Sequence, residues 1–309
     1  MPPGWCSSDS EEGAHVAEAE SPSPLIYRRR LRAELRKARQ EAGLTQEKVA
    51  AEMDWSLSKI IRIENGEVSI AINDLRAVLP YYGISDSRHV DELLDLARAA
   101  KQRSWWSRFS RYASPQFIQF VEFENSAATI RNFEPQLVPG LLQTEEYARV
   151  ATSRFADEHN ANKLLELRMK RQELVVRKAP PKFYFLINEE VVRRGLGGPT
   201  VMESQIQKLI DMAARENVTL QVIPFDVGVF PGMHNPFVIH EFPDAVGNGT
   251  ANNDALYVEN PRGDLISYEK PEEIIFYREV FGQLQSLALD SRGSISLLNR
   301  VSREYAGRG

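Results

Sequence analysis

The chain has 309 residues, which is enough for two domains of ordinary size. Its hydrophobic fraction of 42% and charged fraction of 26% are typical of globular proteins. No apolar run approaches the roughly 20 residues that a membrane helix needs, so we expect no membrane partner. The single cysteine, Cys6, excludes an intramolecular disulfide and favours a reducing compartment such as the cytoplasm.

The net charge of −5 is distributed unevenly along the chain. Residues 1–27 hold five Asp and Glu side chains and no Lys or Arg, whereas residues 28–66 hold ten basic and six acidic side chains. Because salt screens electric fields beyond about 10 Å, a basic segment can attract phosphates even within an acidic protein. We therefore predict a disordered acidic tail at 1–26 and a nucleic-acid-binding segment behind it.

Residues 27–100 show the pattern of five successive helices. In the first, Leu31, Leu35 and Ala38 recur at helical spacing, and Gly43 ends it. The second follows Thr45 as its cap and runs over 46–53, and the third follows Ser56 and ends at Asn65 and Gly66. Apolar periods around 72–79 and 90–97 indicate the fourth and the fifth. The segment is thus expected to form an all-α domain.

A tract rich in aromatic side chains follows at residues 101–125. Arginines within it, among them Arg103, Arg108 and Arg111, would suit a surface on which nucleic-acid bases stack. Aromatic residues at this density are more typical of a core or of an interface between domains. We interpret 101–125 as a connector and as the candidate surface for a homodimer. Its large aromatic residues are Trp105, Trp106, Phe109, Tyr112, Phe117, Phe120 and Phe123.

Residues 126–309 mix helical and extended patterns. Helices are expected at 144–156 and 161–178, and two more, at 271–289 and 294–304, close the chain. Between them, short apolar runs predict strands, so the region is expected to be an α+β domain with a small sheet. The predicted strands are 183–187, 218–223, 236–241, 255–259 and 265–268, with a helix at 201–214.

This second region lacks the motifs of common catalytic and metal sites. It has no Cys cluster, no His-Glu-x-x-His, no Gly-x-Ser-x-Gly and no phosphate loop. Glu189 and Glu190 form a carboxylate pair, but they follow Asn188 at a helix start, where they complement the helix dipole. His234 and His240 lack a third ligand nearby. We therefore expect no catalytic residue, no cofactor and no metal, and hence no enzyme.

The segment from the first predicted helix to the fourth resembles the Cro/CI-type (XRE) family of helix-turn-helix regulators. The resemblance covers about 31–83 and implies a lambda-repressor-like fold that binds double-stranded DNA. In such a fold the third helix, here about 56–64, enters the major groove with its N-terminal residues leading. Five features agree in register: Gly43, Gln46 at the start of the second helix, Ala50, the apolar Ile60 and Ile63, and Glu64-Asn65-Gly66.

The motif geometry assigns the DNA contacts. Arg62 lies one turn into the third helix and can reach the two acceptors of guanine, while Leu57 suits a thymine methyl or else packs on Trp55. Gln46 opens the second helix, which lies across the backbone, and is expected to hold a phosphate. The predicted contact set is Gln46, Ser56, Leu57, Ser58, Lys59 and Arg62.

Some of these residues also have purely structural interpretations. Ser56 is useful as a helix cap whether or not it touches DNA, and Lys59 serves a base, a phosphate or only the solvent. The arginines at 28, 29, 30 and 32 are expected to add phosphate affinity. The family resemblance implies that Arg39 and Glu64 form a structural pair, which ties the first helix to the end of the third.

Residues 105–290 resemble the uncharacterised C-terminal domain of a group of actinobacterial XRE regulators. Those proteins are described as antitoxin-like and are often encoded beside a small partner protein. The resemblance rests on the segments 133–148, 171–174 and 190–198, and above all on the run Val-Pro-Gly-Leu-Leu-Gln-Thr at 138–144. It implies a regulator without naming a ligand.

These observations together predict a sequence-specific DNA-binding transcriptional regulator. We expect a dimeric, cytoplasmic repressor whose C-terminal domain dimerises and binds a partner protein or an effector. One alternative is an antitoxin-like protein that neutralises a small partner encoded nearby. A further alternative, disfavoured by the missing motifs, is an enzyme with a DNA-binding domain attached.

Overall fold

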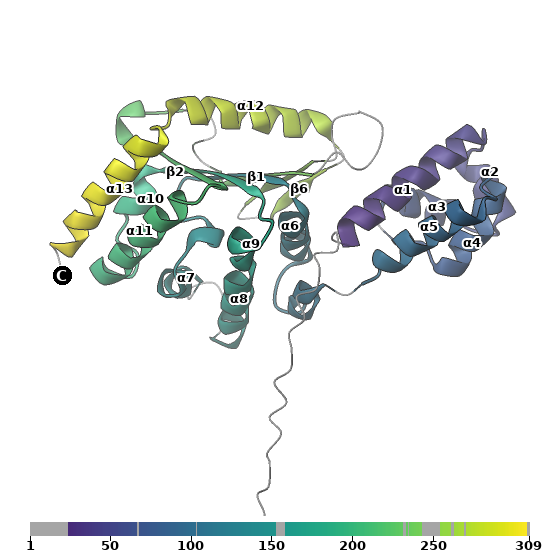
Figure 1. Ribbon diagram of the computed structural model, residues 1–309, viewed down its shortest axis with the longest axis horizontal. Helices are drawn as coiled ribbons and strands as arrows, with labels where there is room; N and C mark the ends of the chain where they lie inside the picture. The colour runs from purple at the N-terminus through teal and green to yellow at the C-terminus, as the bar shows by residue number, and fades with distance from the viewer. Residues whose placement is uncertain are drawn as a thin grey trace, which may run out of the picture.

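The computed structural model describes residues 24–307 except 67, 103, 153–157, 231–232, 234, 243–253, 261–262 and 269. Cys6, Arg103 and His234, which the sequence analysis singled out, lie outside the described residues. Figure 1 shows a group of helices at one end of the molecule and a sheet with helices on both faces at the other. The expected order, an all-α domain followed by an α+β domain, is confirmed.

The first domain consists of five helices around one apolar core. Each helix places its periodic apolar residues inward; in α1 these are Leu31, Leu35 and Ala38. Leu75, Val78 and Leu79 of the fourth helix are fully buried between the others. The helices are α1 (Pro24–Glu41), α2 (Gln46–Glu52), α3 (Leu57–Asn65), α4 (Ile72–Tyr81) and α5 (Ser87–Ala99).

Helix α1 begins earlier than the sequence predicted. It starts at Pro24, within the range 1–26 that was expected to be an acidic tail, and it has 18 residues. Leu25 is buried against Phe123 and Ala255 of the second domain, which gives the first turn an apolar anchor. A single helix therefore takes part in the cores of both domains.

A six-stranded mixed sheet forms the centre of the second domain. The strand order is β3-β2-β1-β4-β5-β6; the first three strands in the chain pair in parallel and the others antiparallel. Five strands agree with the sequence prediction to within one residue at each end, but the central strand β1 was not predicted. The strands are β1 (Thr129–Glu134), β2 (Lys182–Asn188), β3 (Val218–Ile223), β4 (Phe237–Glu241), β5 (Ala255–Val258) and β6 (Leu265–Ser267).

Helices cover the two faces of this sheet unequally. Helix α12 (Pro271–Leu287) lies on one face, and most of the other helices lie on the opposite face (Figure 1). The opposite face holds the larger core, which includes Met202, Ile206 and Leu209 of α11. The remaining helices are α6 (Pro115–Ser126), α7 (Glu145–Thr152), α8 (Glu158–Arg171), α9 (Glu173–Val176), α10 (Glu189–Arg193), α11 (Pro199–Ala213) and α13 (Ser291–Ala306).

The aromatic tract belongs to the core of the second domain. Trp106 and Phe109 of the 3-10 helix η1 (Trp105–Phe109) are buried, as are Phe120 and Phe123 of α6. Residues 101–125 are thus more than a connector, because their apolar side chains pack on the sheet of their own chain. They do not form the exposed apolar surface that the homodimer expectation assumed for 105–123.

The run Val138–Thr144 is held by hydrogen bonds from its own Gln143 and from two side chains of α11. Gln143 Nε2 donates to the Val138 carbonyl at 2.7 Å, and Gln205 Nε2 donates to the Leu142 carbonyl at 2.8 Å. Lys208 Nζ donates to the carbonyl of Gln143 at 2.8 Å. Because buried backbone groups need such partners, this run is a structural centre of the second domain. It includes the 3-10 helix η2 (Gly140–Leu142).

The outer edge of β3 is covered by the turn between α12 and α13. The Leu289 amide donates to the Val222 carbonyl at 2.9 Å, and the Val222 amide donates to Ser294 Oγ at 3.0 Å. Gln221 Nε2 adds a bond of 2.9 Å to the Leu289 carbonyl. This edge strand therefore has hydrogen-bond partners on both sides.

No helix in the described part of the chain is long and apolar enough to cross a membrane.

Candidate nucleic-acid interface

Helices α2 and α3 form a helix-turn-helix whose ends are set by local hydrogen bonds. Thr45 Oγ1 accepts from the Lys48 amide at 3.3 Å and so caps α2, while Ser56 Oγ accepts from the Lys59 amide at 3.2 Å and caps α3. Between them, Asp54 has a φ of 53°, the left-handed conformation that a tight turn needs and that Asp tolerates. Gly66, with φ of 78°, ends α3.

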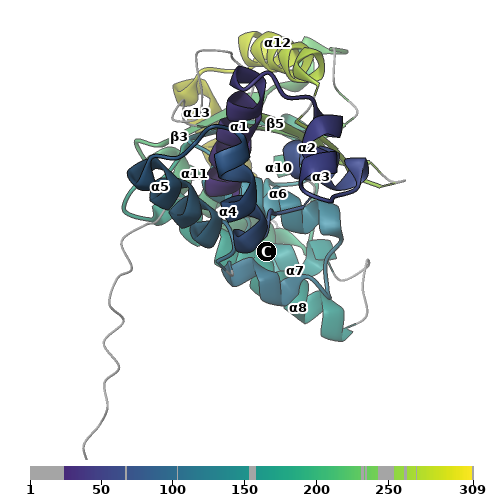
Figure 2. The same cartoon turned by 90° about the vertical axis from the view of Figure 1, so that its right-hand side faces the viewer.

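The core fixes which side of α3 faces outward. Ile60 and Ile63 are buried against Val49 and Ala50 of α2, and the small side chain of Ala50 suits the close approach of the two helices. Residues at other positions of the helical period must then face solvent. Figure 2 shows α2 and α3 next to each other, at the side of the first domain opposite α5.

Three of the predicted base-contacting residues share this outer side of α3. Leu57 is 40% exposed, and Ser58 and Arg62 are exposed as well. An apolar side chain, a hydroxyl and a guanidinium are thereby presented by one short helix, Leu57 and Ser58 from its first turn and Arg62 from its last. Base edges in a major groove present thymine methyl groups, hydrogen-bond donors and acceptors. The three side chains can contact groups of each kind.

Lys59 and Gln46 have partners within the domain. Lys59 Nζ lies 2.8 Å from a carboxylate oxygen of Asp74 and 4.2 Å from the centre of the Trp55 ring, so it ties α3 to α4. Gln46 Nε2 donates to Glu64 Oε2 at 2.8 Å. Both side chains were predicted to contact DNA, and in the structure each also has a partner within the domain.

Glu64 is the buried centre of the motif, with 2% of its surface exposed. Arg39 donates to both of its carboxylate oxygens, from Nε at 2.6 Å and from Nη2 at 3.0 Å, and Gln46 supplies a third hydrogen bond. This pairing with Glu64 raises the pKa of Arg39. Arg39 also donates to the Leu44 carbonyl at 2.7 Å, so α1, the start of α2 and the end of α3 meet here.

The arginines of α1 near residue 30 contact the chain itself. Arg28 forms an ion pair with Glu122 of α6, and Arg32 Nη1 donates to the Asn65 carbonyl at 2.5 Å. Arg36 donates to the Glu64 carbonyl at 2.9 Å. Helix α1 thus supports the C-terminal end of α3, and a phosphate-binding role for Arg28 and Arg32 would have to compete with these contacts.

The residues weighed for chemistry in the second domain have structural surroundings. Glu189 accepts hydrogen bonds from Arg193 Nε at 2.6 Å and from the Phe225 amide at 3.1 Å. His240 is fully buried in β4 beside Phe120, and burial lowers its pKa to about 3. Among the described residues no group of three or more His, Cys, Asp or Glu side chains could hold a metal ion.

Two family models match the chain. A model described as a helix-turn-helix domain matches residues 30–93, and a model described as a domain of unknown function (DUF5753) matches residues 117–300. No curated protein and no solved structure matches it significantly. The first match begins within α1, ends within α5 and supports a DNA-binding regulator, as the sequence predicted.

Proposed function

Because the chain belongs to the DUF5753 family and carries a helix-turn-helix domain ahead of that region, we propose that it is a dimeric transcriptional repressor of the Cro/CI type. Helix α3 reads base edges in the major groove, while α2 lies across the phosphate backbone. The observation that carries this proposal is the joint exposure of Leu57, Ser58 and Arg62 on a helix whose opposite side is buried.

The electrostatics of the segment support the same function. Residues 28–66 hold four more basic than acidic side chains, whereas the rest of the chain is acidic. Basic side chains concentrated in one segment of the chain can attract DNA to that segment. We also propose that the protein acts in the cytoplasm, a reducing compartment of the kind that its single cysteine favours.

A selection from random duplexes with the full-length protein tests the DNA-binding proposal. We expect an enriched site with two-fold symmetry and half-sites about one helical turn, roughly 34 Å, apart. Arg88→Gln, which removes an exposed positive charge on α5 outside the helix-turn-helix, is expected to select the same site. Enrichment of no sequence, or of one asymmetric half-site, would contradict the proposal.

Repression and assembly need separate measurements. Transcription in vitro from a promoter that contains the selected site is expected to fall when the protein is added, and a rise would make it an activator.

Sedimentation of the full-length chain is expected to show a dimer. We propose that the second domain dimerises or binds a partner and performs no chemistry. Co-purification with the product of a neighbouring reading frame would favour the antitoxin-like alternative.

A further inference from the structure

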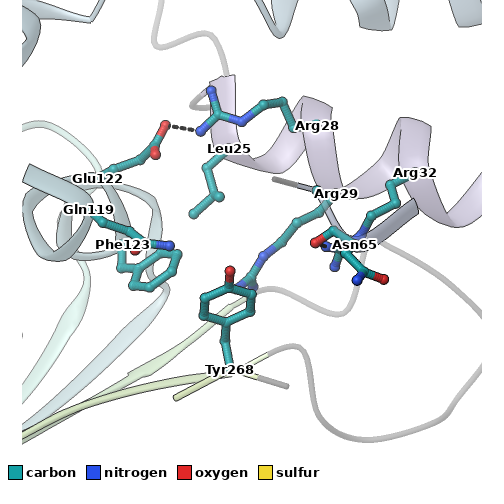
Figure 3. A pocket seen from close by; sticks show the side chains of 10 residues that line it. Leu25, Arg28, Arg29, Arg32, Asn65, Gln119, Glu122, Phe123 and Tyr268 are labelled. Carbon is teal, nitrogen blue, oxygen red and sulfur yellow. Dashed lines mark hydrogen bonds and ion pairs between the residues drawn. The ribbon is translucent and has the colours of Figure 1, made fainter. Parts of the chain in front are cut away.

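The first and second domains enclose a pocket between them. Its volume is about 70 Å³, and its walls come from α1, the C-terminal end of α3, helix α6 and the residue after β6 (Figure 3). The α1 side contributes Leu25 and three arginines, and the opposite side contributes Gln119, Glu122, Phe123 and Tyr268. Because both domains supply walls, a ligand held here would contact both at once.

The pocket is positively charged. Arg28, Arg29 and Arg32 line it, and Glu122 is the one carboxylate among its lining residues, so the formal charge of the lining is +2. Figure 3 shows Arg28 directed to Glu122, Arg29 extending toward Tyr268, and Arg32 beside Asn65. A doubly negative group of small size would match this charge.

The surroundings of Arg29 favour an anion. Its guanidinium lies 4.2 Å from the ring centre of Phe242 and 5.4 Å from that of Phe123, and burial together with the repulsion of Arg32 lowers the pKa of Arg29 to about 10. An anion beside these two guanidinium groups would relieve this repulsion.

We propose that this pocket is an effector site for a small molecule that carries a phosphate group. Phosphate fits better than carboxylate, because a phosphate monoester has a charge near −2 at pH 7 and three acceptor oxygens for several guanidinium donors. The volume admits the phosphate group itself, while the remainder of the ligand lies in the open mouth of the pocket.

The site is linked to the recognition helix through Arg32. This side chain lines the pocket and also donates to the carbonyl of Asn65, the last residue of α3. A bound phosphate competes with that carbonyl for Arg32 and so weakens the support of the C-terminal turn of α3. Occupancy of the pocket therefore lowers the affinity for the operator, and by linkage the operator lowers the affinity for the ligand.

Binding itself is measured first, because it does not depend on the proposed function. Calorimetry on the full-length protein uses pyrophosphate as the probe, with citrate as a carboxylate of similar charge and chloride to equalise the ionic strength. We expect pyrophosphate to bind at least tenfold more tightly than citrate. No binding, or equal binding of the two anions, would overturn the proposal.

Two substitutions place the anion in this pocket. Arg29→Gln removes a buried guanidinium, and Gln119→Glu adds a carboxylate to the wall while all arginines remain; each is expected to weaken pyrophosphate binding at least tenfold. If Arg29→Gln fails to fold, Gln119→Glu alone tests whether pyrophosphate binds in this pocket. The matched controls are the exposed substitutions Arg88→Gln on α5 and Gln283→Glu on α12, which should bind like the wild type.

The coupling to DNA rests on the proposed function and has its own readout. Saturating pyrophosphate is expected to weaken operator binding at least fivefold in the wild type and in Gln283→Glu but not in Gln119→Glu. If the anion binds and the operator affinity does not change, the effector role is excluded while the pocket stands. If Gln119→Glu alone weakens DNA binding as much as pyrophosphate does, the pocket takes a phosphate of the DNA, which would overturn the proposal.

Discussion

A buried arginine–glutamate pair lies in each domain of this protein, and the two pairs differ in what surrounds them. In the first domain Arg39 holds both oxygens of Glu64, and in the second Arg171 Nε and Nη2 hold both oxygens of Glu124 at 2.7 Å. Glu64 also accepts from Gln46 at the start of α2. Arg171 instead lies against aromatic rings of α6, 5.0 Å from the centre of Phe120.

The same type of buried ion pair therefore has a different role in each domain. The Glu64 pair organises a surface, because its partners include a side chain at the start of the helix expected to cross DNA. The Glu124 pair joins α6 to α8 inside a core. We therefore expect loss of Glu64 to impair both folding and DNA binding, and loss of Glu124 to impair folding alone.

The largest effect is expected from Glu124→Gln. Arginine stays charged in proteins, so Arg171 would remain in the core without its counter-charge, at a cost of about 3–5 kcal/mol. Hydrogen exchange resolved by domain should show faster opening of the second domain and little change in α2 to α4. Glu173→Gln, which disturbs an exposed pair with Lys170, is the control; an equal effect there would remove the argument.

Glu64→Ala is expected to cost somewhat less, about 2–3 kcal/mol. Arg39 is 11% exposed and keeps its bond to the Leu44 carbonyl, so its charge is better compensated than that of Arg171. Operator binding should weaken too, because Gln46 loses its partner. Lys59→Ala removes only a half-exposed pair with Asp74 and should cost less than about 1 kcal/mol. Equal unfolding midpoints for the two variants would contradict this prediction.

Arg62→Ala separates recognition from stability. The side chain is exposed on α3, so we expect unfolding to change little, while binding to the best duplex weakens by roughly 1–3 kcal/mol and the sequence preference relaxes. Filter binding on the selected site and on random duplexes measures both. Equal losses on the two duplexes would mean that Arg62 contacts a phosphate only.

The smallest effect is expected from Gln46→Ala. Glu64 keeps its two bonds from Arg39, so the loss of one hydrogen bond should cost about 0.5–1.5 kcal/mol of stability. DNA binding should weaken with the preferred site unchanged, since α2 lies over the backbone. A selection with this variant that yields a different consensus would show that Gln46 reads a base.

The first domain could be predicted closely because its information is local. Apolar residues at helical spacing, capping residues such as Thr45 and Ser56, and glycines at the ends define its helices within short stretches of sequence. The partners of Lys59 and Gln46 were not predicted, since Asp74 and Glu64 lie 15 and 18 residues away along the chain. Spacing along a single helix cannot identify such pairs.

The second domain was harder because its centre is non-local. Strand β1 carries Arg131, Asn132 and Glu134 among its six residues and so lacks the apolar run of a buried strand, although it pairs on both sides. The pair of Glu124 and Arg171 joins residues 47 positions apart. The density of aromatic residues in α6 predicted a core or an interface. It could not identify that core as the core of the second domain.

The covered edge of β3 has a consequence for how copies of this chain can meet. Open edge strands offer rows of amides and carbonyls to other molecules, and many proteins aggregate or oligomerise by adding a strand there. At Val222 both backbone groups are already bonded to the segment that leads into α13. Growth of the sheet from this side would first require the last helix to be peeled away. Self-association of the folded protein through the backbone of β3 is therefore blocked at Val222.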